Sequence, residues 1–268
     1  MSRPEHLAPP EIYYDDQQAK KYLTSTRMNE IQQNLTERAL ELLCLPPNQK
    51  SLLLDLGCGS GLSGDVITEE GHDWVGFDIS QAMLNAASSR DVEGDLVLLD
   101  LGQGLPLRTG IFDGAISVSA IQWLCNADKT CNDPRKRLAS FFSTLYASLI
   151  RGSRAVLQFY PDSSDQVDLL LTAAQKAGFS GGLVVDFPNS TRAKKYFLCL
   201  TAGPPSSSLP TTNDIRLDTE TRKRKKKRNN GISLKSRILA KKERQRRQGR
   251  EVRPDSKYTG RKRSGKLR

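Results

Sequence analysis

The chain has 268 residues, 37% of them hydrophobic, and a formal net charge of +11, because 41 Lys and Arg outnumber 30 Asp and Glu. It contains no run of about 18 apolar residues, which excludes a membrane-spanning helix, and its N-terminal segment MSRPEHLAPPEIYYDD has no apolar core of a secretion signal. The five cysteines have no close pairs, which argues against a disulfide framework and a zinc site, so we expect an intracellular, reduced protein without bound metal.

The charge is divided unevenly along the chain. Residues 1–203 contain 18 Lys and Arg against 24 Asp and Glu, a net charge of −6, whereas residues 204–268 contain 23 against 6, a net charge of +17. A segment this basic indicates contact with nucleic acid. We therefore predict an N-terminal arm with an amphipathic helix (1–50), a folded domain (51–203), a linker (204–221) and a basic, largely disordered tail (222–268).

Short β-rich runs alternate with helical patterns through the predicted domain. The predicted strands, in chain order, are 51–56, 73–78, 95–99, 112–118, 154–160, 183–187 and 195–201. The predicted helices between them include 80–89, 134–149 and 163–177, where apolar residues recur at three- and four-residue spacing. This alternation is typical of an α/β fold with a mostly parallel, seven-stranded sheet covered on both faces.

Two further features complete the predicted fold. The last two strands are joined only by residues 188–194, which are too few for a helical crossover, so we expect an antiparallel final pair. Upstream, Ile31, Leu35 and Leu42 lie on one face of an amphipathic helix, which we expect to pack on the rim of the sheet.

The most informative motif is LLLDLGCGSGLSG, at residues 52–64. An apolar run leads into Asp55, Gly57, Gly59 and Gly61, and glycines at a strand-to-helix turn let a ligand approach the backbone closely. The G-x-G-x-G spacing departs from the G-x-G-x-x-G dinucleotide fingerprint, and the Gly-Lys-Ser/Thr ending of a phosphate-binding P-loop is missing. Both observations disfavour a dehydrogenase and a nucleotide triphosphatase.

Two more carboxylates end predicted strands. Asp78 closes the run DWVGFD, and Asp100 closes LVLLD before Leu101. Ligands of open α/β sheets bind at the carboxyl ends of the strands, where a carboxylate can accept hydrogen bonds from ribose hydroxyls. We therefore expect Asp55, Asp78 and Asp100 to converge on one crevice.

This order of motifs resembles that of the class I, Rossmann-like S-adenosylmethionine-dependent methyltransferases. The resemblance implies that the glycine loop wraps the methionine part of the cofactor, that Asp78 holds the ribose, and that Asp100 contacts the adenine. The cofactor-binding residues that it implies are Asp55, Gly57, Gly59, Gly61, Asp78, Ile79, Asp100, Leu101 and Ser117. The alternative is a non-catalytic Rossmann-like domain in which the aspartates only cap the ends of strands.

The methyl acceptor is less constrained by the residues themselves. The stretch SVSAIQWL after the fourth strand lacks the [Asn/Asp]-Pro-Pro-aromatic motif of enzymes that methylate exocyclic amines. Cys125 has no neighbouring His to make it a nucleophile for base C5 methylation, and only His6 and His72 are available for acid–base chemistry. Guanine N7, which has a free lone pair and no proton to lose, needs no base; the sequence permits this acceptor without requiring it.

Several segments narrow the resemblance to one family. RPEH…PPE-x-YYDD…AKKY (3–22), FDGAISVSAIQWLCNA (112–127), RGSRAVLQFYP (151–161), KAGFSGGLVVDFPNS (176–190) and KKERQRRQGREVRPDSKYTGRKR (241–263) are similar to the eukaryotic small-subunit (18S) rRNA guanine-N7 methyltransferases, the bud-site-selection family. The resemblance fades over residues 204–230. It implies a protein of the nucleoplasm and nucleolus, with some in the cytoplasm, that acts in 18S rRNA processing and small-subunit assembly.

The same resemblance implies a partner and a base pocket. The partner is a small zinc-binding activator subunit that forms a heterodimer beside the strand from Asp95 to Leu99, and an unpaired strand at a sheet edge invites such strand addition. We name Gln122 and Trp123 as candidates to hold the target base, with core packing an equally good role for the Trp. The predicted lid residues are Tyr13, Tyr14 and Tyr22, unless they only fasten the N-terminal arm.

The basic tail predicts phosphate contacts with 18S rRNA or a small-subunit precursor. Residues 222–228 (RKRKKKR) and 241–263 carry most of its charge, and such runs also serve as nuclear import signals. Two other functions remain open: a ribosome-assembly factor whose presence rather than its chemistry is essential, and a methyltransferase acting on a protein or small molecule. The second alternative leaves the tail unexplained.

Overall fold

The computed structural model describes residues 4–127, 132–190 and 193–203, together with residues 239, 242, 243, 246 and 252–256 of the tail. The chain divides into two compact units, Met1–Leu217 and Asp218–Arg268. No helix of the described part is long and apolar enough to cross a membrane. Most of the predicted linker and basic tail lies outside the described residues.

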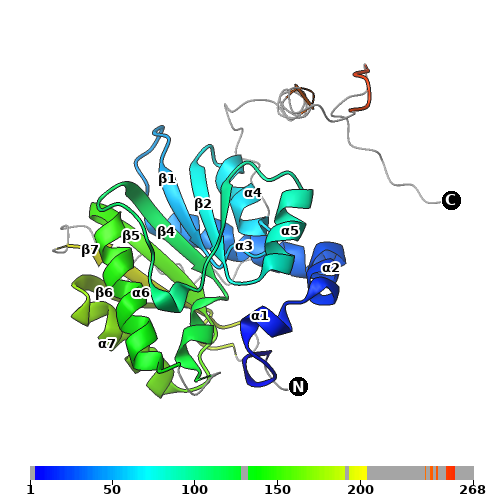
Figure 1. Ribbon diagram of the computed structural model, residues 1–268. Coiled ribbons are helices and arrows are strands. Elements are labelled where there is room, and N and C mark those ends of the chain that lie inside the picture. Colours follow the sequence, from blue (N-terminus) through cyan, green and yellow to red (C-terminus); the bar gives the residue numbers. More distant parts are fainter. Residues whose placement is uncertain are drawn as a thin grey trace. The chain divides into compact units, whose positions relative to one another are not determined.

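The first unit is built on a seven-stranded sheet with the order β3-β2-β1-β4-β5-β7-β6 (Figure 1). Its strands are β1 (Leu52–Leu56), β2 (Asp73–Asp78), β3 (Asp95–Leu98), β4 (Phe112–Val118), β5 (Leu149–Phe159), β6 (Phe179–Asp186) and β7 (Lys195–Ala202). The strands from β1 to β5 pair in parallel, and β7 runs antiparallel to both β5 and β6. The predicted fold class, including the antiparallel last strand, is confirmed.

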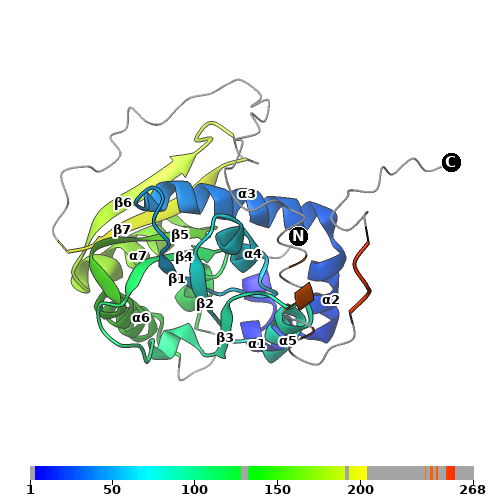
Figure 2. The same ribbon diagram turned by 90° about the horizontal axis from the view of Figure 1, so that it is seen from above.

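Helices cover both faces of this sheet (Figure 2). The helices are α1 (Pro10–Tyr13), α2 (Asp16–Thr24), α3 (Thr26–Leu43), α4 (Leu62–Glu69), α5 (Gln81–Ser89), α6 (Pro134–Ser148) and α7 (Ser164–Lys176), with 3-10 turns η1 (Pro4–His6), η2 (Leu101–Gln103) and η3 (Ile121–Cys125). One apolar core joins α6, α7 and η3 to the sheet, and the other joins α3, α4 and α5 to it. Both faces are buried, as parallel strands require.

The position of α3 differs from the expected one. Leu35, Ala39 and Leu42 pack in one core cluster with Ile116 of β4 and Val156 of β5, so α3 lies across a face of the sheet and not on its rim. The expectation was wrong because an amphipathic pattern identifies an apolar stripe without specifying which surface receives it.

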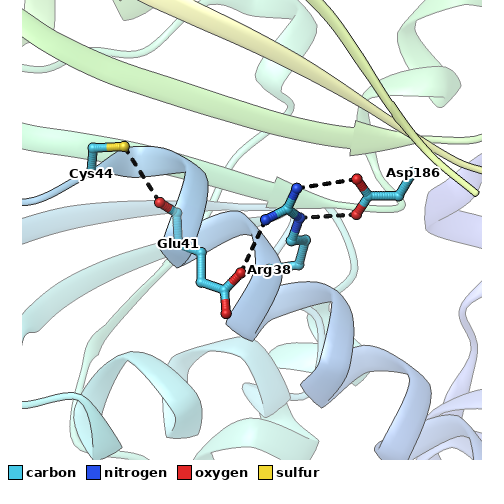
Figure 3. A network of polar contacts seen from close by, with 4 residues as sticks. All are labelled: Arg38, Glu41, Cys44 and Asp186. Carbon is cyan, nitrogen blue, oxygen red and sulfur yellow. Dashed lines mark hydrogen bonds and ion pairs between the residues drawn. The ribbon is translucent and has the colours of Figure 1, made fainter. Parts of the chain in front are cut away.

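A polar network fixes the C-terminal half of α3 against β6 (Figure 3). The Arg38 guanidinium donates to both carboxylate oxygens of Asp186, at 2.9 and 3.2 Å, and to Glu41 at 3.0 Å. Cys44 ends the helix in the left-handed region, at φ 51°, with its thiol directed at the Glu41 carbonyl. The bidentate pair ties the helix to the far edge of the sheet.

Two strands begin several residues earlier than the sequence predicts. Strand β5 begins at Leu149 rather than at residue 154, and it passes through Gly152 at φ 89°. Strand β6 begins at Phe179 rather than at residue 183, because Gly181 is paired with Leu200 at φ 133° and a Cβ there would lie 2.1 Å from the Cys199 carbonyl oxygen. Glycines weaken a strand pattern in sequence, yet here they permit close backbone pairing.

Candidate functional site

A pocket opens at the carboxyl ends of β1, β2 and β4, where the predicted motifs meet. Its walls include Gly57, Gly59, Ser63, Asp78, Ile79, Met83, Leu99, Asp100, Leu101, Val118, Ser119, Ala120, Trp123 and Arg137, with Pro10 and Tyr14 from the N-terminal arm. The parallel strands end together at this edge, so residues distant in sequence become neighbours.

The glycine loop between β1 and α4 forms the floor of this pocket. Gly57, Gly59 and Gly61 all have positive φ, at 81°, 52° and 78°. A Cβ on Gly57 would lie 2.3 Å from the Cβ of Ala120, so a side chain there is excluded by space as well as by conformation. The turn brings backbone close to the pocket. Gly61, the N-cap of α4, provides no side-chain cap, which leaves N–H groups at the N-terminus of the helix for a ligand.

Asp78 ends β2 and binds the loop as well as facing the pocket. Its Oδ2 accepts a hydrogen bond from the Gly59 amide at 2.8 Å, and its Oδ1 accepts one from the Ser80 amide at 2.8 Å. Burial raises the pKa of Asp78, while these backbone donors act in the opposite direction. Each carboxylate oxygen can accept a further hydrogen bond, which suits a pair of ribose hydroxyls.

Asp55 lies beneath the loop instead of on the pocket wall. It is fully buried, and its Oδ2 accepts a 2.6 Å hydrogen bond from the Ser63 hydroxyl, while Oδ1 accepts none from any described residue. Burial raises the pKa of Asp55 to about 7, and the charge of Asp78 adds to the rise. A cation bound above the loop would stabilise the ionised form of this carboxyl.

Asp100 meets an arginine that sequence reasoning missed. The carboxylate accepts a 2.9 Å hydrogen bond from the Gly102 amide, which caps η2. The Arg137 guanidinium of α6 donates to the same carboxylate at 2.5 Å and forms an ion pair with it. Arg137 is only 9% exposed and lines the pocket. It precedes the buried Phe141 by four residues and so lies on the same, apolar face of α6. A charged residue on that face was the signal in the sequence that could have identified Arg137.

Ser117 has a different position from the other predicted cofactor residues. It is buried in β4, its hydroxyl donates to the Leu56 carbonyl of β1 at 2.7 Å, and it is not among the residues that line the pocket. Ile79 and Leu101 do line it.

An aromatic cluster closes the other end of the pocket. Tyr14 and Trp123 both line it, with ring centroids 5.7 Å apart and planes at 61°. Tyr13 contacts both rings, with centroids at 5.1 and 6.0 Å, and the Tyr14 carbonyl accepts a 2.7 Å hydrogen bond from Ser80. The predicted lid residues Tyr13 and Tyr14 thus lie against the predicted base-pocket Trp; the side chain of Tyr22 lies outside the described residues.

Gln122 lies behind this cluster and does not line the pocket. It is 5% exposed, and its amide nitrogen donates to Glu5 of the arm and to the Ser119 carbonyl, each at 2.9 Å. A second arm contact joins His6 to Asp162 at 2.5 Å. The arm is therefore fastened to η3 and to Asp162, and its residues Pro10 and Tyr14 line the pocket.

Cys125, His6 and His72 are poorly placed for covalent or acid–base catalysis. Burial raises the pKa of the Cys125 thiol to about 12, so it carries no thiolate at neutral pH. His72 accepts a hydrogen bond from the Ser51 amide at 3.2 Å and does not line the pocket, and neither does His6. Among the described residues no group of three or more His, Cys, Asp or Glu is placed to hold a metal ion.

The described residues of the second unit form a small polar cluster. Lys242 and Arg246 both bond to Asp255, at 2.9 and 2.8 Å, and these two basic groups lower the pKa of its carboxyl. Lys242 also donates to the carbonyl groups of Arg253 and Pro254. One acidic residue thus gathers two basic side chains of the tail.

Comparisons with known proteins agree with this site. Residues 54–152 match the family described as "Methyltransferase domain", and residues 201–265 match "Methyltransferase involved in Williams-Beuren syndrome". Two solved methyltransferases share the fold. One, from Haemonchus contortus in complex with S-adenosyl-L-methionine, has a TM-score of 0.55 and 16% identity over 76% of this chain and 61% of that one. The other, a TehB-like methyltransferase from Corynebacterium glutamicum, has a TM-score of 0.51 and 19% identity over 70% of this chain and 99% of that one.

Full-length relatives specify the family. The chain is 59% identical to the 18S rRNA (guanine-N(7))-methyltransferase of Mus musculus, over 97% of this chain and 96% of the relative. It is 54% identical to the 18S rRNA (guanine(1575)-N(7))-methyltransferase of Saccharomyces cerevisiae, over 98% of each. At this identity, over nearly the whole length of both chains, the chain belongs to the family of 18S rRNA (guanine-N7)-methyltransferases.

Proposed function

We propose that this protein transfers a methyl group from S-adenosylmethionine to N7 of a guanine in 18S rRNA, and so takes part in pre-rRNA processing and small-subunit assembly. The observation that carries the proposal is the convergence of Asp78, Asp100 and the glycine loop on one pocket, in a chain of this family. The guanine is the counterpart of the one that the name of the yeast relative specifies.

The residues present fit the cofactor. Asp78, which lines the pocket, would hold the ribose hydroxyls, Asp100 with Leu101 would border the adenine, and the glycine loop would admit the methionine part. The unpaired Oδ1 of Asp55 beneath the loop places negative charge near a cationic ligand. When bound, S-adenosylmethionine supplies an electrophilic methyl group on a sulfonium centre.

The protein's own part in the reaction is alignment. Guanine N7 attacks with a lone pair and loses no proton, so no general base is needed, and neither histidine lines the pocket. Trp123 and Tyr14 offer aromatic faces on which an extruded guanine can stack. Holding the base in line with the methyl group and excluding water are the contributions that such a site makes.

The exposed edge of the sheet supports an activator subunit as partner. Among the described strands, β3 pairs only with β2 and ends the strand order, and its residues Val97 and Leu98 are 37% and 52% exposed. An apolar edge with unpaired backbone groups suits strand addition by a second protein. We propose the zinc-binding activator of the family as the protein that covers it.

The basic tail supports an RNA partner and a nuclear address. Residues 204–268 carry a net charge of +17, from 23 Lys and Arg against 6 Asp and Glu, which favours phosphate contacts with 18S rRNA in the small-subunit precursor. Basic runs of this kind also direct import, so we propose a nuclear and nucleolar location with a cytoplasmic fraction.

A methyl-transfer assay tests the proposal. The full-length protein, produced together with the activator, is incubated with methyl-labelled S-adenosylmethionine and an 18S fragment that contains the target guanine. We expect labelled 7-methylguanosine after nuclease digestion, and none from a fragment with adenine at that position. Label on a different nucleoside, or transfer to protein alone, would overturn it.

The second candidate function is an assembly factor whose presence is what the cell requires. The tail favours it, because phosphate contacts need no chemistry in the pocket. A pocket variant that lacks methyl transfer yet supports normal small-subunit production would establish that role beside the enzymatic one.

A further inference from the structure

Two buried side-chain oxygen atoms behind the pocket-lining residue Trp123 have no hydrogen-bond donor among the described residues. They are Oε2 of Glu5, in the N-terminal arm, and Oε1 of Gln122, in η3, and neither accepts a hydrogen bond from a described residue. A buried acceptor without a donor costs about 1–3 kcal/mol. Two of them on side chains that bond to each other point to a ligand that supplies the donors.

The orientation of the Gln122 amide is fixed by its partners. Its nitrogen lies 2.9 Å from both Glu5 Oε1 and the Ser119 carbonyl oxygen, and both of these atoms only accept. Turning the amide over would place its oxygen against two other oxygens. Oε1 of Gln122 is therefore an acceptor, and it lies beside the carboxylate of Glu5.

Gln122 belongs to η3, which borders the pocket, and Glu5 of η1 is linked to it by the 2.9 Å hydrogen bond from Gln122. Gln122 stands between the pocket-lining residues Ala120 and Trp123, and it is bonded to Ser119, which also lines the pocket. Glu5 precedes His6, whose bond to Asp162 holds η1 in place. The acceptor pair is thus joined to the pocket lining through Ser119 and through Trp123, the next residue of η3.

The chemistry of the pair selects one base. Guanine presents two adjacent donors on its Watson–Crick edge, N1–H and the 2-amino group, whereas adenine, cytosine and uracil each present no more than one donor there. A carboxylate and an amide oxygen, both acceptors, match only the guanine pattern. A guanine held by that edge leaves N7, on its Hoogsteen edge, free to react.

We propose that Glu5 and Gln122 read the Watson–Crick edge of the target guanine, with Glu5 brought to the base by the N-terminal arm. The inference rests on the proposed function and deepens it by naming the residues that recognise the base. Because both oxygens are enclosed, the arm lifts to admit the base and closes over it.

Substrates that differ by one amino group test this reading. The full-length protein with its activator is given two 18S fragments, one with guanosine and one with inosine at the target position; inosine lacks the 2-amino group. We expect the wild-type protein to methylate guanosine about 10- to 100-fold faster, as a hydrogen bond to a charged group warrants. In Glu5→Ala this preference falls at least about fivefold.

A matched variant separates base reading from arm anchoring. His6→Ala removes the neighbouring arm contact without touching the acceptor pair, so it slows both substrates alike and keeps the guanosine preference. An unchanged preference in Glu5→Ala would overturn the inference and leave Glu5 as an arm anchor only. Cofactor affinity, which both variants retain, verifies that they fold.

A binding measurement keeps this claim separate from the proposed function. Affinities for the two fragments are measured with S-adenosylhomocysteine present, where no methyl transfer occurs. Failure of the wild-type protein to form 7-methylguanosine would overturn the proposed function alone. The ratio of the affinities for the guanosine and the inosine fragment is compared between the wild-type protein and Glu5→Ala. If this ratio is the same in both, the reading of the base by Glu5 is overturned and the proposed function stands.

Discussion

The carboxylate of Asp78 accepts a 2.8 Å hydrogen bond from the backbone amide of Gly59, so the acid that faces the ribose site also holds the glycine loop in shape. Asp78→Asn would turn an NH2 group toward either this amide or that of Ser80, both of which are donors. We expect cofactor affinity to fall about 10- to 100-fold, since a buried donor without an acceptor costs about 1–3 kcal/mol.

Isothermal titration with S-adenosylhomocysteine measures this loss. Asp73→Asn, at the exposed start of the same strand, is the matched control and should bind normally. Normal affinity in Asp78→Asn would show that the loop keeps its shape without the carboxylate.

Gly57→Ala should destabilise the protein more than an alanine at another glycine with positive φ. Both Gly57 and Gly110 have positive φ, at 81° and 65°, but only at Gly57 does a new Cβ meet another atom, at 2.3 Å from Ala120. Gly110→Ala carries the conformational cost alone, about 1–2 kcal/mol. Urea unfolding of the two variants compares them, and equal losses would contradict the close approach of the loop to Ala120.

The pH dependence of stability should contain a contribution from Asp55. Its pKa is about 7 in the folded protein and about 4 in the unfolded chain, so the folded state binds the proton more tightly. The resulting stabilisation is complete below pH 4 and is lost as the pH rises through about 7. Asp55→Asn removes this contribution, so the unfolding free energy should decline less between pH 5 and 7 than in the wild type.

Denaturant unfolding without cofactor at several pH values gives these curves. Asp95→Asn, which changes an exposed carboxylate at the start of β3, serves as control and should keep the wild-type slope. Parallel curves for Asp55→Asn and wild type would mean that Asp55 ionises as freely in the fold as in the unfolded chain.

Arg137→Ala should weaken the adenine end of the cofactor site. The side chain is nearly buried, lines the pocket and pairs with Asp100 at 2.5 Å, so its removal leaves the carboxylate without its counter-charge. We expect at least about a tenfold loss of cofactor affinity, because removing one partner of a largely buried pair costs several kcal/mol. Arg135→Ala, two residues earlier in α6 and exposed, should change affinity little. Equal cofactor affinities of the two variants would show that Arg137 does not contribute to the cofactor site.

Leu98→Lys should prevent association with the activator. Leu98 is 52% exposed on the edge strand β3, where a charge would have to be buried under an added partner. Co-purification of tagged activator reports the complex. Ile111→Lys is the control, because Ile111 is 41% exposed and precedes β4, away from that edge strand. A complex that survives Leu98→Lys would place the partner elsewhere.

The sequence predicted the parts of the site that depend on local pattern. Asp78 and Asp100 follow apolar runs, and the glycines stand at a strand-to-helix turn, so the parallel sheet brings them together once it forms. The fold class and the family predicted from these motifs are confirmed. The position of Asp55 beneath the loop could not be foreseen, because motif spacing does not say which side of a turn a carboxylate takes.

The contacts that sequence reasoning missed are tertiary ones. Arg137 is 37 residues from Asp100 along the chain, and Glu5 is 117 residues from Gln122, yet each pair is hydrogen-bonded. No periodicity links such pairs. Ser117 lies in the predicted strand, but its hydroxyl turns toward Leu56 of the neighbouring strand, since the pleat and not the motif decides where it points.

The most direct test of the central claim is the mapping of N7-methylguanosine in 18S rRNA from cells depleted of this protein and supplied with the wild-type chain or with Asp78→Asn. We predict that the modification disappears on depletion, returns with the wild-type chain and stays absent with Asp78→Asn. A guanine that remains methylated at N7 after depletion, or that is restored equally by Asp78→Asn, would contradict it.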